Sequence, residues 1–187
     1  MQNTINLSTR NNLVRALAQP LTFAFGFAAI TAVAAQIAVP VKPVPFTFQT
    51  AMVVLSGAVL GARYGALSQF LYLAAGVAGL PVFANGAFGP AVLFGPTGGY
   101  LLAFPVGAFV VGLIVERRRS RFAVVGAMFL GNAIVVALGA LYLDALYVHD
   151  LSTSLEVGAA IFSLWAVAKV FVASLAFVGV EKFSKRG

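Results

Sequence analysis

The chain has 187 residues, of which 61% are hydrophobic and only 9% are charged. Its mean hydropathy of +0.99 excludes a soluble globular domain, because so few polar side chains cannot cover the surface of one. It has no cysteine and a single histidine, which excludes disulfides, thiol catalysis and thiolate metal sites. We therefore expect one integral membrane domain over residues 1–187, with no metal and no cofactor.

The chain is expected to begin with a short tail and one long membrane segment. Residues 1–12 are polar and predict a frayed end. The apolar run over about 13–37 can cross a hydrocarbon core about 30 Å thick, for which about 20 residues suffice. Pro40, Pro43 and Pro45 then force an extended connector, because proline fixes φ and lacks a backbone N–H.

Two shorter apolar segments follow, over about 47–60 and 64–80, on either side of a Gly-Ala-Arg-Tyr-Gly turn. Each is a little short for a full span. The pair therefore predicts either two transmembrane helices or a re-entrant hairpin. Arg63 at the tip favours the first, because a charge there is expected to emerge into water.

The stretch over 79–100 is rich in glycine and proline and carries no charge, although it separates two strongly apolar segments. Irregular backbone at membrane depth is tolerated only where it is buried in protein or lines a cavity. We therefore expect this loop to fold inward and build a binding site. Asn85, Thr97 and Tyr100 are its only polar side chains.

Three further apolar segments, over about 98–115, 122–146 and 157–180, complete the pattern. If the N-terminus is cytoplasmic, all of the 12 basic residues except Lys42 and Lys169 belong to cytoplasmic loops or ends. The net charge of +7 is then a topology signal that follows the positive-inside rule, and not a nucleic-acid patch. We expect an all-α bundle of six transmembrane helices with both termini cytoplasmic and an outward-facing ligand pocket.

Lys169 lies about midway along the last apolar segment. A charge there costs several kcal/mol unless it is paired or reaches water, which makes the residue a candidate for a functional site. No acidic residue lies within one helical turn, which suits a lysine that binds an anionic ligand such as a carboxylate. The alternative is a lysine that snorkels to the lipid headgroups.

Other candidates for ligand contacts are amides and aromatic rings. Gln49 and Asn85 either hydrogen-bond an amide-like group of a ligand or satisfy the loop backbone. Aromatic side chains either wall an apolar ligand or face lipid; these are Phe46, Phe48, Phe83, Tyr100 and Trp165. Asn132 is interpreted as a link between helices or a ligand contact, and Asp144 and His149 as a solvated outer rim.

Small residues recur every four positions in the first apolar segment, at Ala24, Ala28 and Ala32. Such a stripe lets helices approach closely. Two interpretations remain open: the stripe packs inside the bundle, or it docks onto a partner protein.

Four sequence blocks carry a family resemblance. In their order and spacing they resemble the BioY family, the biotin-binding S components of energy-coupling factor transporters; the blocks span 39–50, 60–65, 78–83 and 94–100. The resemblance covers about residues 13–183. It implies a six-helix protein of the bacterial cytoplasmic membrane that binds biotin near the outer face. It also implies partners, a transmembrane coupling protein and two cytoplasmic ATPases, and alanine contacts with the former.

The family's usual ligand-binding patterns are altered in this chain. Ala166 stands where the family has the aspartate of a Gly-Asp-x-x-Lys pattern, whose lysine corresponds to Lys169. Ala87 lies in a loop that commonly reads Gly-Gly-x-Gly-Gly, and Leu101 replaces an arginine of some relatives. Biotin or a related heterocyclic carboxylate is therefore the expected substrate, and either end of the ligand could contact the lysine.

Other function classes fit the sequence less well. A membrane enzyme would need paired acids, a metal cluster or a nucleophile with a base, and the acidic residues all lie near water. A secondary transporter would be expected to show repeats or coupling acids at mid-membrane, and neither is visible. No Walker loop is present, so any energy for transport has to come from other chains. We interpret the chain as a transport subunit and not as an enzyme.

Overall fold

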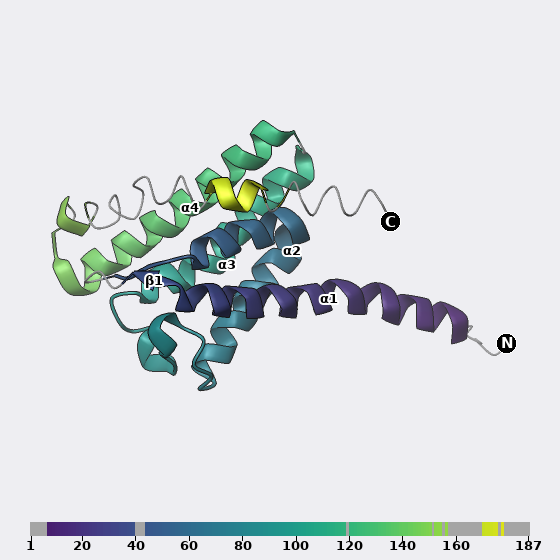
Figure 1. The fold of residues 1–187 in the computed structure, drawn as a ribbon, viewed down its shortest axis with the longest axis horizontal. Coiled ribbons are helices and arrows are strands. Elements are labelled where there is room, and N and C mark those ends of the chain that lie inside the picture. The colour runs from purple at the N-terminus through teal and green to yellow at the C-terminus, as the bar shows by residue number, and fades with distance from the viewer. Residues whose placement is uncertain are drawn as a thin grey trace.

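The computed structural model is a mostly helical assembly (Figure 1). It describes residues 7–39, 44–118, 120–150, 152–154, 156, 170–175 and 177. Its long helices are α1 (Leu7–Gln36), α2 (Gln49–Val77), α3 (Gly98–Arg117) and α4 (Arg121–Leu143). The short elements are strands β1 (Ala38–Val39) and β2 (Phe46–Thr47), the 3₁₀ turns η1 (Ala84–Gly86) and η2 (Pro90–Val92), and the π-helical turn η3 (Asp144–Val148).

By length and composition alone, three helices in the described ranges are long and apolar enough to cross a membrane: Gln49–Val77, Gly98–Arg117 and Arg121–Val148. A shorter apolar helix spans Pro20–Gln36 inside α1. These helices fit the predicted all-α membrane protein. Most of the last expected segment, over 157–180, lies outside the described residues.

The frayed tail predicted over 1–12 is wrong for its second half, because α1 begins at Leu7. Hydropathy marks the apolar run but not the end of the helix. Once a helix exists, each added residue gains one backbone hydrogen bond, so polar residues can extend it beyond the membrane segment.

Helix α2 turns back on itself at Gly61, whose φ of +79° suits glycine. Across this corner, a Cβ on Gly65 would lie 2.7 Å from the Cα of Gly57, so the two halves of α2 meet almost backbone to backbone. The carboxylate of Glu116, at the end of α3, accepts a hydrogen bond of 2.8 Å from the N–H of Ala62. The corner therefore rests on glycine backbone and on one acceptor from the neighbouring helix.

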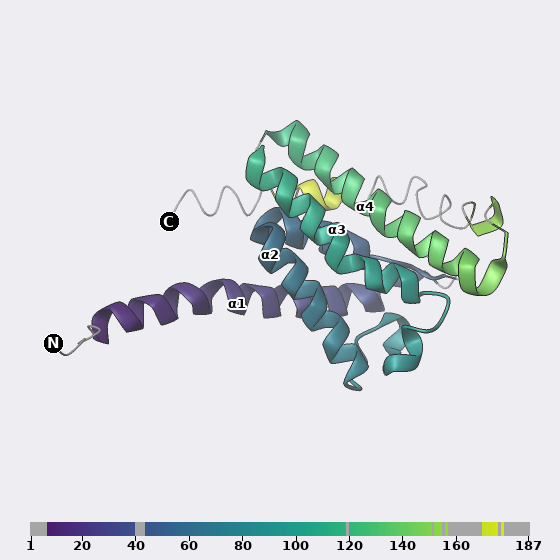
Figure 2. The same cartoon turned by 180° about the vertical axis from the view of Figure 1, so that it is seen from behind.

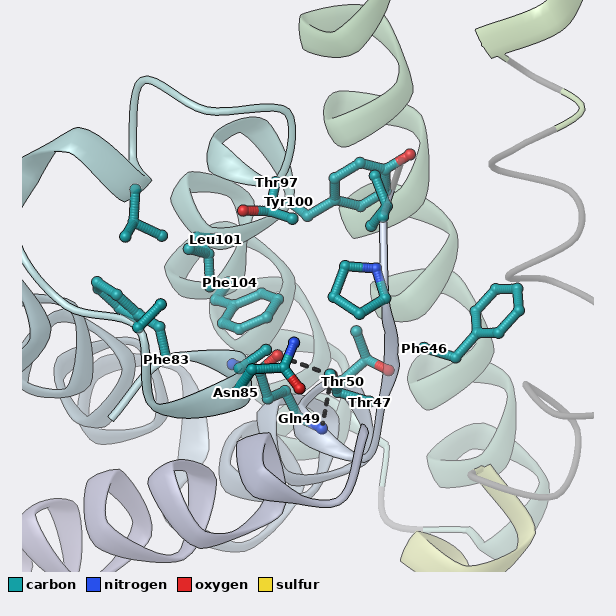
Figure 3. A pocket seen from close by; sticks show the side chains of 15 residues that line it. Phe46, Thr47, Gln49, Thr50, Phe83, Asn85, Thr97, Tyr100, Leu101 and Phe104 are labelled. Atoms are coloured by element: carbon teal, nitrogen blue, oxygen red, sulfur yellow. Dashed lines mark hydrogen bonds between the residues drawn. The ribbon is translucent and has the colours of Figure 1, made fainter. Parts of the chain in front are cut away.

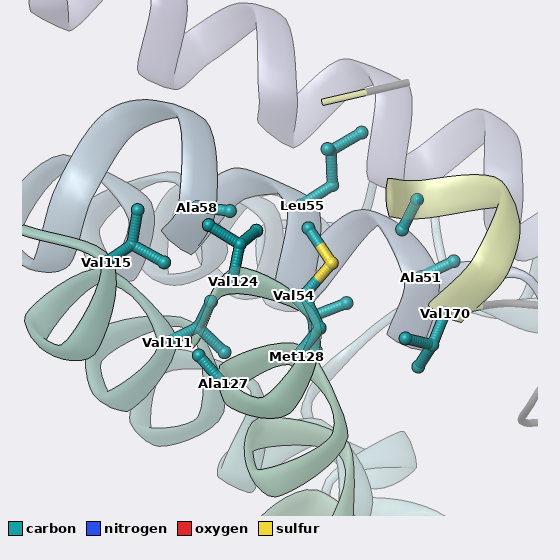
Figure 4. Packing of buried hydrophobic residues seen from close by; sticks show 11 residues of the cluster. Ala51, Val54, Leu55, Ala58, Val111, Val115, Val124, Ala127, Met128 and Val170 are labelled. Carbon is teal, nitrogen blue, oxygen red and sulfur yellow. The ribbon is translucent and has the colours of Figure 1, made fainter. Parts of the chain in front are cut away.

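The core lies where α2, α3 and α4 cross (Figure 4). Apart from Met128 its side chains are short or branched, and all are buried; they include Ala51, Val54, Val111, Ala127, Met128 and Ala173. Glycines allow the helices to approach closely, since a Cβ on Gly112 would overlap the backbone of Ala62. Lipid tails are as apolar as these side chains, so close packing is what favours helix association in a bilayer.

A group of buried polar side chains joins α1 to both halves of α2. The amide nitrogen of Gln69 lies 3.1 Å from the hydroxyl of Ser56, 2.9 Å from that of Ser68 and 3.4 Å from that of Thr31. All four residues are fully buried. Because an unpaired polar group is costly in a membrane interior, this network fixes how α1 and α2 pack.

Candidate functional site

A cavity of about 230 Å³ lies where the connector after α1, the loop over 79–97 and the start of α3 meet (Figure 3). Three short stretches of chain line it: Val44, Pro45, Phe46, Thr47, Gln49 and Thr50; Phe83, Ala84, Asn85, Ala87 and Val92; and Thr97, Tyr100, Leu101 and Phe104. The lining is apolar with a few hydroxyl and amide groups, and none of these residues is charged.

Local sequence explains how each stretch reaches the cavity. The connector returns as β2 and pairs antiparallel with β1, Ala38 opposite Thr47, which places the start of α2 beside the cavity. The loop turns through positive φ at Gly79, Asn85, Gly86 and Gly89, conformations that glycine and asparagine adopt readily.

One wall is a rigid group of aromatic rings. Phe83 is only 1% exposed, and its ring contacts Tyr72 edge to face with centroids 5.6 Å apart. Tyr72 in turn stacks on Phe104 at 6.3 Å. Gly76 makes room for this arrangement, because a Cβ there would overlap the ring of Phe83. Fixed rings of this kind suit an apolar ligand surface.

Gln49 supplies an amide whose orientation is set by its neighbours. It is 5% exposed, its Oε1 accepts a hydrogen bond of 2.7 Å from the hydroxyl of Thr47, and its Nε2 donates to the hydroxyl of Tyr72. The Tyr72 hydroxyl donates onward to the carbonyl of Val82 at 3.1 Å. An amide has two N–H donors and two acceptor lone pairs, so one of each remains for a ligand.

Asn85 and Tyr100 also bring polar groups near the cavity, but the two groups differ in accessibility. Asn85 is exposed at the cavity, on the η1 turn, with a φ of +58°. Tyr100 contributes its ring to the wall, while its hydroxyl points away from Thr97 in Figure 3 and has no hydrogen-bond partner in the part of the chain that the structure describes. Asn85 therefore offers the more accessible hydrogen-bonding group.

The residues predicted for ligand binding fall into three groups. Those that line the cavity are Gln49, Asn85, Phe46, Phe83 and Tyr100. The ring of Phe46 lies apart from the other labelled side chains in Figure 3, and Phe48 packs against the core around Met128 instead. Lys169 and Trp165 lie outside the described residues. Their roles in binding stay predictions.

Sequence reasoning did not assign Thr97 or Phe104 to ligand binding, although a helical pattern could have found them. Together with Tyr100 and Leu101 they recur at the spacing of one helix face, beginning where the loop ends. Thr47 gave a weaker signal, because its contact with Gln49 depends on where β2 ends and α2 begins.

The alanine stripe of α1 lies against the protein interior. Ala24 is fully buried, and Ala28 and Ala32 are half-buried against the core group that contains Phe83 and Leu101. This placement corresponds to packing inside the bundle, one of the two interpretations that the sequence left open. Docking of these alanines onto a partner stays a prediction.

The remaining polar candidates lie away from the cavity. Asn132 is buried in α4, and neither atom of its amide group has a partner among the described residues. His149 is exposed beyond η3. Next to it, hydroxyl donors from Ser152 and Thr153 lower the pKa of Asp150 below its ordinary value.

Comparison with known proteins identifies the family. Residues 2–186 match the model of the BioY family. The chain belongs to the BioY family. It is 43% identical over 156 residues to a Thermotoga maritima protein named biotin transporter BioY, covering 83% of this chain and 92% of that protein. It is 35% identical over 153 residues to biotin transporter BioY2 of Lactococcus lactis, covering 79% and 82% respectively.

A solved structure supports the same assignment. The S-component for biotin from an ECF-type ABC transporter superposes with a TM-score of 0.83 at 25% identity, over 90% of this chain and 93% of that one. The resemblance to the BioY family inferred from the four sequence blocks is thus confirmed. The BioY relatives are named as transporters, which agrees with the prediction of a transport subunit and not a membrane enzyme.

Proposed function

We propose that this BioY-family protein is the S component of a biotin uptake transporter, which captures biotin and delivers it with an energy-coupling module. One observation carries the proposal: three of the four blocks that resemble the family, over 39–50, 78–83 and 94–100, contribute residues to a single cavity. The fourth block, over 60–65, forms the corner of α2 and does not line the cavity.

The chemistry of the cavity suits the head of biotin. Biotin carries a fused ring, a ureido group and a carboxylate on an alkyl tail. The ring and tail match the wall around Phe83 and Phe104, and the ureido group, which donates and accepts like an amide, matches Gln49 and Asn85. Since none of the described lining residues is charged, we assign the carboxylate to Lys169, which lies outside the described residues.

The proposed orientation places the cavity at the outer face of a bacterial cytoplasmic membrane, with six helices and both termini inside. The exposed cations Arg63, Arg117, Arg118 and Arg121 support it. They lie at the corner of α2 and at the turn between α3 and α4, at the end of the bundle opposite the loop (Figure 2). Clustered cations mark the cytoplasmic side.

The sequence holds no Walker loop, the motif that binds ATP in many transport ATPases. We therefore propose that a transmembrane coupling protein and ATPase subunits supply the energy for transport. Vesicles that contain this protein alone are then expected to bind biotin without concentrating it when ATP is added. ATP-driven accumulation by the chain alone would contradict the S-component assignment, and accumulation driven by an ion gradient would favour a secondary transporter.

A further inference from the structure

Side chains from the surrounding helices contact the cavity loop and add to the backbone hydrogen bonds that it makes. Four of its carbonyl groups accept hydrogen bonds from them: Val82 from Tyr72, Phe83 from Gln36, Leu93 from Tyr142 and Phe94 from Tyr147. Backbone outside regular structure needs such partners at membrane depth. The position of the loop over the cavity therefore depends on a few identifiable contacts.

Gln36 makes the most specific of these contacts. It is the last residue of α1, and its Nε2 donates to the carbonyl of Phe83 at 3.1 Å while its Oε1 accepts from the N–H of Gly86 at 3.1 Å. One amide thus binds both ends of the turn over 83–86. That turn carries Phe83, Ala84 and Asn85, which all line the cavity.

Gln36 and Tyr72 bind neighbouring carbonyl groups of the loop but differ in how exposed they are. Tyr72, which holds Val82, is 1% exposed, so breaking its hydrogen bond leaves polar atoms without water. Gln36 is exposed, so water can replace its hydrogen bonds at small cost. The backbone of the 83–86 turn beyond the buried ring of Phe83 is therefore held less strongly than Val82, and Gln36 is a side chain that opposes its release.

We propose that Gln36 is a positioning residue that holds the 83–86 turn, and Asn85 with it, over the cavity and thereby sets how long a ligand stays bound. The role rests on the proposed binding of biotin. Gln36 does not line the cavity, so it acts through the turn and not by touching the ligand. Because Ala32 of the same helix packs against the core that contains Phe83, the contact also ties α1 to the mouth of the cavity.

The test measures the release of labelled biotin from the purified full-length protein after a chase with unlabelled biotin. Gln36→Leu keeps a side chain of similar size but removes both hydrogen bonds to the turn, along with the one that Nε2 donates to the carbonyl of Ala32 within α1, and it is expected to speed dissociation about tenfold. Association is expected to change much less, because the open cavity is unaltered. Gln36→Glu keeps the acceptor for the Gly86 N–H and loses the donor, so its dissociation rate is expected to fall between those of the wild type and Gln36→Leu.

Val33→Ala is the matched control, because Val33 lies one turn earlier on α1 with its side chain 68% exposed. It is expected to leave both rates unchanged. Dissociation from Gln36→Leu at the wild-type rate would overturn the proposal while leaving biotin binding intact. Equal effects of Gln36→Leu and Gln36→Glu on association and dissociation, with a lowered melting temperature, would make Gln36 merely structural and overturn it too.

A second readout needs no ligand and separates this proposal from the proposed function. Amide hydrogen exchange over 84–87 in the ligand-free protein is expected to be several-fold faster in Gln36→Leu than in the wild type. Exchange at Gly89, whose N–H donates to the carbonyl of Gly76 at 2.8 Å, is expected to stay the same. Unchanged exchange over 84–87 would overturn the role of Gln36 whether or not the protein binds biotin.

Discussion

Gln49 offers the sharpest test of the cavity, because its structural and ligand-binding roles can be separated. Gln49→Leu removes the hydrogen bonds with Thr47 and Tyr72. At about 1 kcal/mol each, the free energy of unfolding is expected to fall by about 2 kcal/mol. If the remaining N–H and lone pair of the amide also serve the ureido group of biotin, an unpaired polar group costs about 1–3 kcal/mol more in the complex, and the Kd for biotin is expected to rise about 10- to 100-fold.

Ser68→Ala is the matched control for this prediction. It also removes two hydrogen bonds, one to the carbonyl of Gly65 and one from the amide of Gln69, and is expected to lower stability by a similar amount, about 2 kcal/mol. Ser68 does not line the cavity, so the Kd for biotin is expected to rise less than about threefold. Calorimetric titration and thermal unfolding of both variants give the comparison. Equal loss of biotin affinity in the two variants would show that Gln49 supports the cavity without contacting the ligand.

Two further predictions concern charge and backbone. Lys169→Met keeps the apolar stem and removes the charge. It is expected to weaken the binding of biotin by about 2–5 kcal/mol, because a buried carboxylate loses its partner, but to change the binding of a neutral biotin amide little. Equal affinity of wild type and variant for biotin would refute the assignment of the carboxylate to Lys169. Gly61→Ala is expected to lower the free energy of unfolding by about 1–3 kcal/mol, measured by circular dichroism on heating. Gly61 has a φ of +79°, which strains alanine, and a Cβ there would displace the carboxylate of Glu116 from the N–H of Ala62. Gly126→Ala, where a Cβ meets nothing within 4 Å, should not destabilise; equal losses in both variants would contradict the argument.

Hydropathy was informative about helices because a membrane segment must be apolar and must satisfy its backbone internally. Helices α3 and α4 accordingly begin close to the apolar runs over 98–115 and 122–146. The uncharged loop was equally informative, since irregular apolar backbone has few places to lie other than around a cavity. These features depend on local sequence, which is why no structure was needed to propose them.

Phe48 shows where local reasoning breaks down. Phe46 and Phe48 would share one face of a strand, where side chains repeat every two residues. Strand β2 ends at Thr47, however, and Phe48 caps the start of α2. The chain changes direction between the two rings, so Phe46 lines the cavity while Phe48 packs against the core.

Contacts between distant residues left no trace in the sequence. Gln36 and Phe83 are 47 positions apart, and Gln69 and Thr31 are 38 apart. Gln36 ends α1 and Gln69 lies within α2, and the residues next to them in the sequence do not predict these distant partners. Only the packing of α1 against α2 and the loop brings these groups together.

The central claim is that the cavity of this BioY-family protein binds biotin, and equilibrium binding of labelled biotin to the purified full-length protein tests it most directly. We predict saturable binding that unlabelled biotin displaces and that unrelated vitamins do not, since the cavity pairs a rigid aromatic wall with amides that suit a ureido group. Absence of saturation with biotin, alongside saturation with another heterocyclic carboxylate, would contradict it.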